Sequence, residues 1–146
     1  ILMKKKILMW FLAFAIVFAF TGNASASSST LNVNVLTYLN TKNPYTPMSN
    51  GHLNFCANAR VYQTKTSVTP LVGDAYSQTF KVTVRNSGVE ASRLEQLGSK
   101  SFGTTYNWHN VVVTVGGLNT NSSYICQFGN AQAVYYIKGT VQVIYN

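Results

Sequence analysis

The sequence predicts an all-β protein, an antiparallel β-sandwich of about seven strands, on two observations. Apolar and polar residues alternate with a period of two in several segments, for example from Tyr76 to Arg85. This period turns one set of side chains inward and the other outward, as in a half-buried strand. Segments rich in Gly, Pro, Asn and Ser separate these runs, and short strands between closely spaced turns are typical of sandwiches and barrels.

The alternation predicts strands in six segments of the chain. In the first of them, Val33, Val35 and Leu39 share the inner face. One short helical turn is expected near 89–97, ended by Gly98. In chain order the six strand segments are 31–40, 53–61, 76–85, 111–115, 124–128 and 133–145.

The last predicted strand is apolar on both faces, because Tyr136 and Ile144 lie opposite Ile137 and Val143. It is either central and covered on both sides, or it leaves an apolar face for another subunit or a membrane. The second alternative predicts self-association through the C-terminal strand. Gly139 is expected to put a bulge in this strand.

Residues 1–26 have the three parts of a secretory signal peptide. Three lysines follow Met3, the expected true start, and an apolar run from Ile7 to Phe20 leads to an A-x-A sequence that ends at Ala26. The apolar run is shorter than the roughly 20 residues that a membrane-spanning helix needs. We therefore expect cleavage after Ala26, secretion to the extracellular space, and one domain over 27–146.

The net charge of +8 falls to +5 when the three leader lysines are removed (8 − 3 = 5). The remaining Lys and Arg residues are spread singly along the chain. A nucleic-acid groove usually clusters its cations, so no nucleic-acid partner is expected. The positive charge serves either solubility or a general attraction to anionic surfaces, including anionic membranes.

The segment from Val113 to Cys126 resembles part of immunoglobulin-like and fibronectin type III-like sandwiches. One strand ends, a corner carries Leu118, and Tyr124 opens the next strand two residues before a cysteine. The resemblance implies an immunoglobulin-like sandwich and a tyrosine corner, in which the Tyr124 hydroxyl bonds back to the backbone. The core tryptophan of immunoglobulin domains has no counterpart soon after Cys56.

Cys56 and Cys126 are the only cysteines, and an even pair in an exported protein of this size predicts a disulfide. The phase of 53–61 turns Cys56 outward, so the bond would need a bulge or a sheet edge. One alternative is a catalytic thiol with His52 or His109 as its base. Another is a zinc site made by the two cysteines and these two histidines. Residues four apart on a strand lie about 13 Å from each other, which disfavours zinc. No metal and no cofactor are expected.

The carboxylates do not form a pair suited to catalysis. Asp74 lies in a turn, and Glu90 and Glu95 are five residues apart on the expected helical turn. No nucleophile-elbow, P-loop or dinucleotide-binding pattern occurs. We expect no enzymatic activity.

The best candidate for a ligand site is the cluster Tyr106, Asn107, Trp108 and His109, which combines rings with hydrogen-bonding groups in an expected loop. Such groups suit a sugar or a peptide. The alternative is that Trp108 fills the end of the core. The sequence favours a secreted, cationic, non-enzymatic binding protein at or near a bacterial cell surface, whose partner is a wall polymer, a glycan or a protein. A membrane-active antimicrobial or pore-forming toxin and a self-assembling surface or fibre subunit are the alternative functions.

Overall fold

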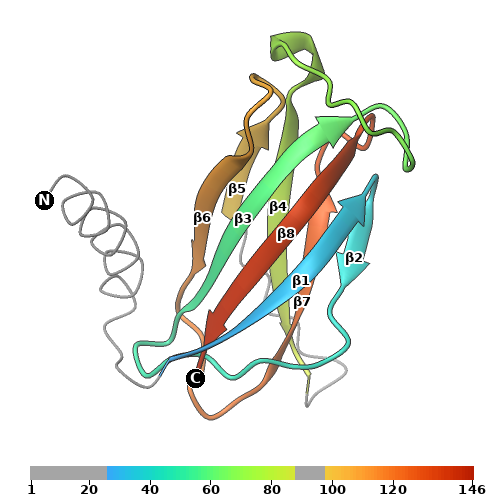
Figure 1. Cartoon of the computed structure of the whole chain (residues 1–146). Helices are drawn as coiled ribbons and strands as arrows, with labels where there is room; N and C mark the ends of the chain where they lie inside the picture. Colours follow the sequence, from blue (N-terminus) through green and yellow to red (C-terminus); the bar gives the residue numbers. More distant parts are fainter. Residues whose placement is uncertain (1–25, 88–97) are drawn as a thin grey trace, which may run out of the picture.

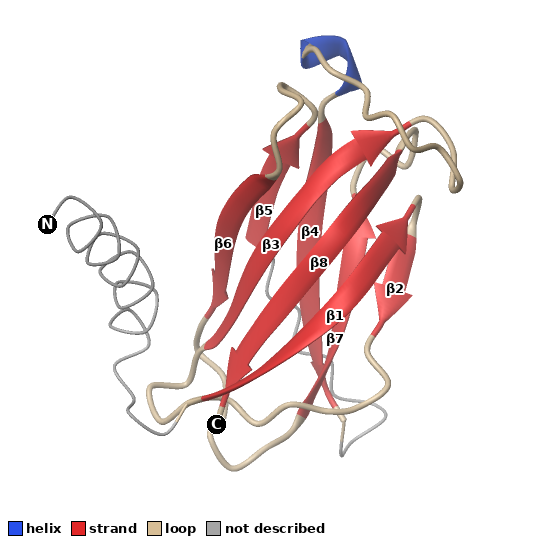
Figure 2. Cartoon of the chain, viewed as in Figure 1, coloured by secondary structure: helices blue, strands red, loops and turns tan. Residues whose placement is uncertain are grey.

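The computed structural model describes residues 26–87 and 98–146, and within them the chain forms two packed β-sheets (Figures 1 and 2). The antiparallel sandwich is confirmed, with eight strands instead of about seven. One 3-10 turn, η1, spans Asp74–Tyr76. The strands are β1 Ser27–Val35, β2 Tyr38–Asn40, β3 Leu53–Tyr62, β4 Gln78–Asn86, β5 Gly98–Phe102, β6 His109–Val115, β7 Tyr124–Asn130 and β8 Tyr136–Tyr145.

Sheet A has the strand order β1-β8-β3-β6 and sheet B the order β2-β7-β4-β5, and every neighbouring pair is antiparallel. The inward-facing side chains of the two sheets form one core. Phe55 of sheet A and Phe80 of sheet B both pack against Phe128, with ring centroids 5.8 Å apart in each pair. Burial of each phenylalanine contributes roughly 1.5–3 kcal/mol, so these rings help to hold the sheets together.

The first predicted strand is in fact two strands that belong to different sheets. β1 keeps Val33 and Val35 buried, but the chain leaves sheet A at Leu36 and pairs with β7 as β2. Leu39, predicted to share the inner face, is 39% exposed. That part of the prediction was wrong because it joined Leu39 to β1 across Leu36, Thr37 and Tyr38, where the alternation breaks and the chain crosses to the other sheet.

β8 lies at the centre of sheet A, paired with β1 on one side and β3 on the other. The central position of this strand is therefore confirmed, but its outer face is not fully covered, because Lys138, Thr140 and Gln142 are only half-buried. Self-association through this strand stays a prediction. The predicted bulge at Gly139 is wrong, because Gly139 pairs in continuous register with Val33 and Ala59.

The corner before β7 has the local geometry that the tyrosine-corner resemblance implied. The Tyr124 hydroxyl accepts a hydrogen bond of 2.9 Å from the backbone N–H of Asn119, and Leu118 is buried. This bond fixes the turn before β7, while membership of the immunoglobulin-like group stays a prediction.

Two predictions fall outside the described residues: the signal peptide before Ala26 and the helical turn near 89–97. In the part of the chain that the structure describes, no helix has the length and apolar character needed to cross a membrane.

Candidate functional site

The outer face of sheet A, meaning the side of β1, β8, β3 and β6 that points away from sheet B, is rich in amides and hydroxyls. The strand register aligns these groups in rows across the sheet. One row runs Asn32–Thr140–Asn58–Asn110 through all four strands. Both Asn58 and Asn110 are exposed, so the row offers neutral hydrogen-bonding groups to a ligand.

A cluster of cations and rings lies on the same face, formed by Arg60, Tyr62, Trp108 and Lys138, and we call it the cation–aromatic cluster. The guanidinium carbon of Arg60 lies 3.8 Å from the centroid of the Trp108 ring and 6.0 Å from that of Tyr62. The Nζ of Lys138 lies 4.3 Å from the Tyr62 centroid. Such contacts attract the cation to the ring face and hold both groups in place.

Strand pairing brings the cluster together from three parts of the chain. Arg60 and Lys138 are cross-strand partners on β3 and β8. Trp108 directly precedes β6, whose first residue, His109, pairs with Ala59. Because side chains alternate along a strand, Trp108 lies on the same face as Arg60.

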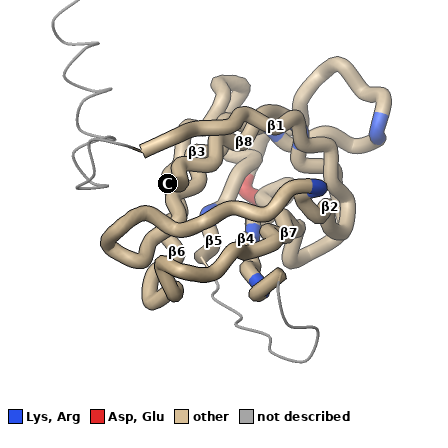
Figure 3. Tube along the Cα trace, turned by 90° about the horizontal axis from the view of Figure 1, so that it is seen from below, with Lys and Arg blue, Asp and Glu red and all other residues tan. Residues whose placement is uncertain are grey.

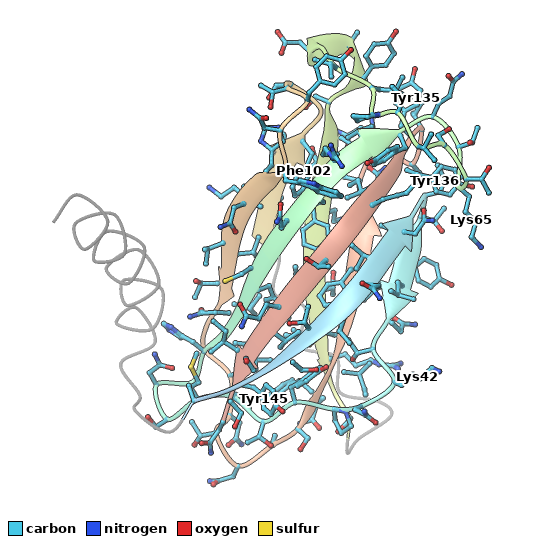
Figure 4. All side chains as sticks on the ribbon, viewed as in Figure 1. Lys42, Lys65, Phe102, Tyr135, Tyr136 and Tyr145 are labelled. Atoms are coloured by element: carbon cyan, nitrogen blue, oxygen red, sulfur yellow. The ribbon has the colours of Figure 1, made fainter. Side chains whose placement is uncertain are left out.

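Two loops hold the cations of the cluster. Arg60 donates a hydrogen bond of 3.2 Å from Nη1 to the Tyr106 carbonyl, and Lys138 donates one of 2.6 Å from Nζ to the Ser67 carbonyl. Desolvation lowers the pKa of Lys138. Thr64 and Ser67 bond to each other across their own turn, so the loop that binds Lys138 is itself fixed. Figure 4 places Lys65, which belongs to this loop, and Tyr136 near the same end of sheet A.

The predicted site residues 106–109 do not act as one group in the structure. Trp108 is 44% exposed, so the alternative that it fills the end of the core is wrong. Tyr106 is 64% exposed, and Asn107 is also exposed. The ring of His109 instead packs edge-on against Phe102, with centroids 5.9 Å apart, and its Nε2 lies 3.4 Å from the Thr105 hydroxyl.

Arg60, Tyr62 and Lys138 were missed as candidates for the site. The phase of 53–61 already turned Arg60 outward together with Cys56 and Asn58. The sequence gives no sign that β6 pairs with β3, and this pairing alone brings Trp108 to Arg60.

The predicted disulfide between Cys56 and Cys126 is wrong, because both residues are free thiols. Cys56 lies on the outer face of sheet A, where its cross-strand partners are Val112 and Gln142. Cys126 belongs to β7 of sheet B and points into the core. The outward phase of Cys56 was correctly predicted, and no bulge reverses it.

Burial raises the pKa of Cys56, and it raises the pKa of Cys126 to about 12. A catalytic thiol needs a lowered pKa, so neither cysteine has the electrostatics of a nucleophile. Among residues 26–87 and 98–146, no group of three or more His, Cys, Asp or Glu side chains is arranged to hold a metal ion. Asp74 is exposed on η1, while Glu90 and Glu95 lie outside the described residues.

Comparison with known proteins gives no further information on function. No known protein family matches this chain, and no curated protein is similar to it in sequence.

Proposed function

We propose that this protein is a secreted, non-enzymatic binding protein that acts at or near a bacterial cell surface. Its ligand is a hydroxyl-rich polymer, such as a glycan or a wall polymer, bound on the outer face of sheet A. The observation that carries the proposal is the half-exposed Trp108 ring, held against Arg60 at the end of rows of amides and hydroxyls.

The chemistry of this face suits sugars. A sugar ring presents an apolar face that stacks on an aromatic ring, and hydroxyls that bond to amides and guanidinium groups. Arg60 and Gly139 fix the Trp108 ring, which reduces the entropy lost on binding. A Cβ atom at Gly139 would lie only 2.9 Å from the ring, so the ring reaches across β3 to β8.

The charge of the face favours a neutral or anionic polymer over a cationic one. Arg60 and Lys138 lie on it, and the described residues contain a single acidic residue, Asp74. Of the other described cations, Lys81 and Arg85 share the outward-facing side of β4 in sheet B. The pair on sheet A differs from them because both of its cations contact aromatic rings; Figure 3 shows where the described Lys and Arg residues lie along the chain.

The proposal is tested by co-sedimentation of the purified protein with insoluble bacterial cell wall, with anionic liposomes in parallel. We expect saturable pelleting with the wall, and a loss of about tenfold in affinity for Trp108→Ala, equivalent to about 1.4 kcal/mol. Arg60→Gln should weaken binding in the same direction.

Arg85→Gln is the matched control, because it removes the same charge from an exposed position on β4 of sheet B. Wild-type affinity for Trp108→Ala, with its far-ultraviolet circular dichroism intact, would refute the site. Pelleting with liposomes alone would instead support the membrane-active alternative.

A further inference from the structure

The outer edge of β1 is a long strand edge without the features that usually prevent pairing with another chain. Natural edge strands are blocked by charged side chains, prolines or bulges. β1 pairs with β8 in unbroken register from Ser27 to Val35 and contains no charged residue and no proline. Within the described residues, no backbone hydrogen bond outside the two sheets involves β1.

The neighbouring edge strand adds exposed apolar surface to the same side of the sandwich. β1 and β2 lie together on one side in two views (Figures 1 and 3). Tyr38 of β2 is 61% exposed and Leu39 is 39% exposed. These are two of the large apolar side chains that the described part of the chain leaves in solvent.

Charge indicates which partner fits this side. The described residues hold seven Lys or Arg and one acidic residue, so two copies of the chain carry positive charges that disfavour contacts between their cationic parts. From Ala26 to Thr41 there is no charged residue. Two lysines lie near this side, Lys42 directly after β2 and Lys65, whose carbonyl accepts a hydrogen bond of 3.1 Å from Asn34 near the end of β1. Two copies can therefore approach through the β1–β2 side without placing like charges opposite each other within the strands.

We propose that two copies of this chain associate through β1, which pairs antiparallel with β1 of the second copy about a two-fold axis near Leu31. This register places Thr30 opposite Asn32 of the second copy. It also keeps Val33 on the inner side in both copies, because the pairing preserves the alternation. The two sheets A then form one continuous sheet, and such a self-complementary contact is closed and gives a dimer.

The opposite side of the sandwich is less suited to this pairing. There β6 lies above β5, a strand of five residues that carries the exposed Lys100. Lys100 gives that side of the sandwich a positive charge within a strand, whereas β1 and β2 contain none. This comparison favours the β1 edge.

The test is sedimentation equilibrium of the purified protein without ligand, over a range of concentrations and at two salt concentrations. We expect a monomer–dimer equilibrium that shifts toward dimer at higher salt, because salt screens the repulsion between two positive copies. Asn32→Lys should raise the dimer dissociation constant at least tenfold.

Asn110→Lys is the matched control, since it adds the same charge in the same row on the opposite edge strand. It should leave the dissociation constant unchanged. A monomer at every concentration, or a dimer weakened by Asn110→Lys and not by Asn32→Lys, would overturn the proposal. The measurement uses no ligand, so its outcome is independent of the proposed binding function.

A second measurement covers the case in which Asn32→Lys does not fold. Leu31→Cys in a Cys56→Ser background places one thiol beside its symmetry copy, and mild oxidation should give a covalent dimer. Absence of that dimer in a folded protein would also overturn the proposal.

Discussion

The two thiols differ in the environment that each has in the fold. Cys126 is fully buried among apolar side chains of the core, while Cys56 is partly exposed on the outer face of sheet A. Reaction with an alkylating reagent requires both access and the thiolate form. Burial restricts both at Cys126 and has a smaller effect at Cys56.

Alkylation with iodoacetamide at pH 8, without reductant, should therefore modify native Cys56 slowly and leave Cys126 unmodified. The same treatment in denaturant should modify both. Mass spectrometry of the intact protein counts the adducts. If denatured, unreduced protein carries none, the two cysteines form a disulfide.

At the scale of single elements, β8 depends on a residue without a side chain. A Cβ atom at Gly139 would lie 2.0 Å from the Asn58 carbonyl oxygen and 2.8 Å from the Ala59 Cα, both backbone atoms of β3. Backbone atoms of a central strand cannot move aside without breaking the pairing. The glycine therefore permits the close approach of β8 and β3 beneath Trp108.

Gly139→Ala should lower the free energy of unfolding by roughly 1–3 kcal/mol or more, as overpacking does, and should weaken wall binding because it displaces the Trp108 ring. Urea unfolding followed by circular dichroism measures the first effect, and co-sedimentation the second.

Gly129→Ala is the control for the loss of a strand glycine. Its Cβ would approach no atom closer than the Thr37 carbonyl oxygen at 3.3 Å, so its effect should be smaller. Equal destabilisation by the two variants would contradict the packing argument.

The elements show what the sequence could predict. β4 was predicted correctly because apolar residues alternate with polar ones from Phe80 to Val84, and each of these apolar residues faces the core. β5 was missed because Gly-Ser-Lys-Ser-Phe contains one apolar residue and no alternation. An alternation with a period of two also does not show to which sheet a strand belongs. For this reason the crossing of the chain from sheet A to sheet B between β1 and β2 was not predicted. The contact between Arg60 and Trp108 was not predicted for a related reason, because it depends on the order of the strands in sheet A.

At the scale of the whole molecule, buried ionisable groups make stability depend on pH. The folded protein holds the Cys126 proton up to about pH 12, whereas the unfolded chain releases it near the usual thiol pKa of 9.0. The unfolded state then binds fewer protons, so the free energy of unfolding falls as pH rises from 9 to 12. Lys138, whose pKa is lowered, acts in the opposite direction but is largely solvated.

Cys126→Val should remove this part of the alkaline destabilisation. Between pH 9 and 12 the wild type should lose up to about 4 kcal/mol more than the variant, since each pKa unit corresponds to about 1.36 kcal/mol. Urea unfolding of both proteins at several pH values measures the difference. Parallel pH curves for the two proteins would show that Cys126 does not remain protonated in the fold.

The pairing of β1 with β8 has a mechanical consequence. Ser27 is the partner of Tyr145, so the first strand starts where the last strand ends (Figure 1). Hydrogen bonds between antiparallel strands lie perpendicular to the strands. A force that pulled these two residues apart would therefore break the hydrogen bonds between β1 and β8 one pair after another. β1 would separate from the sheet, while β8 would stay in place because it is still paired with β3.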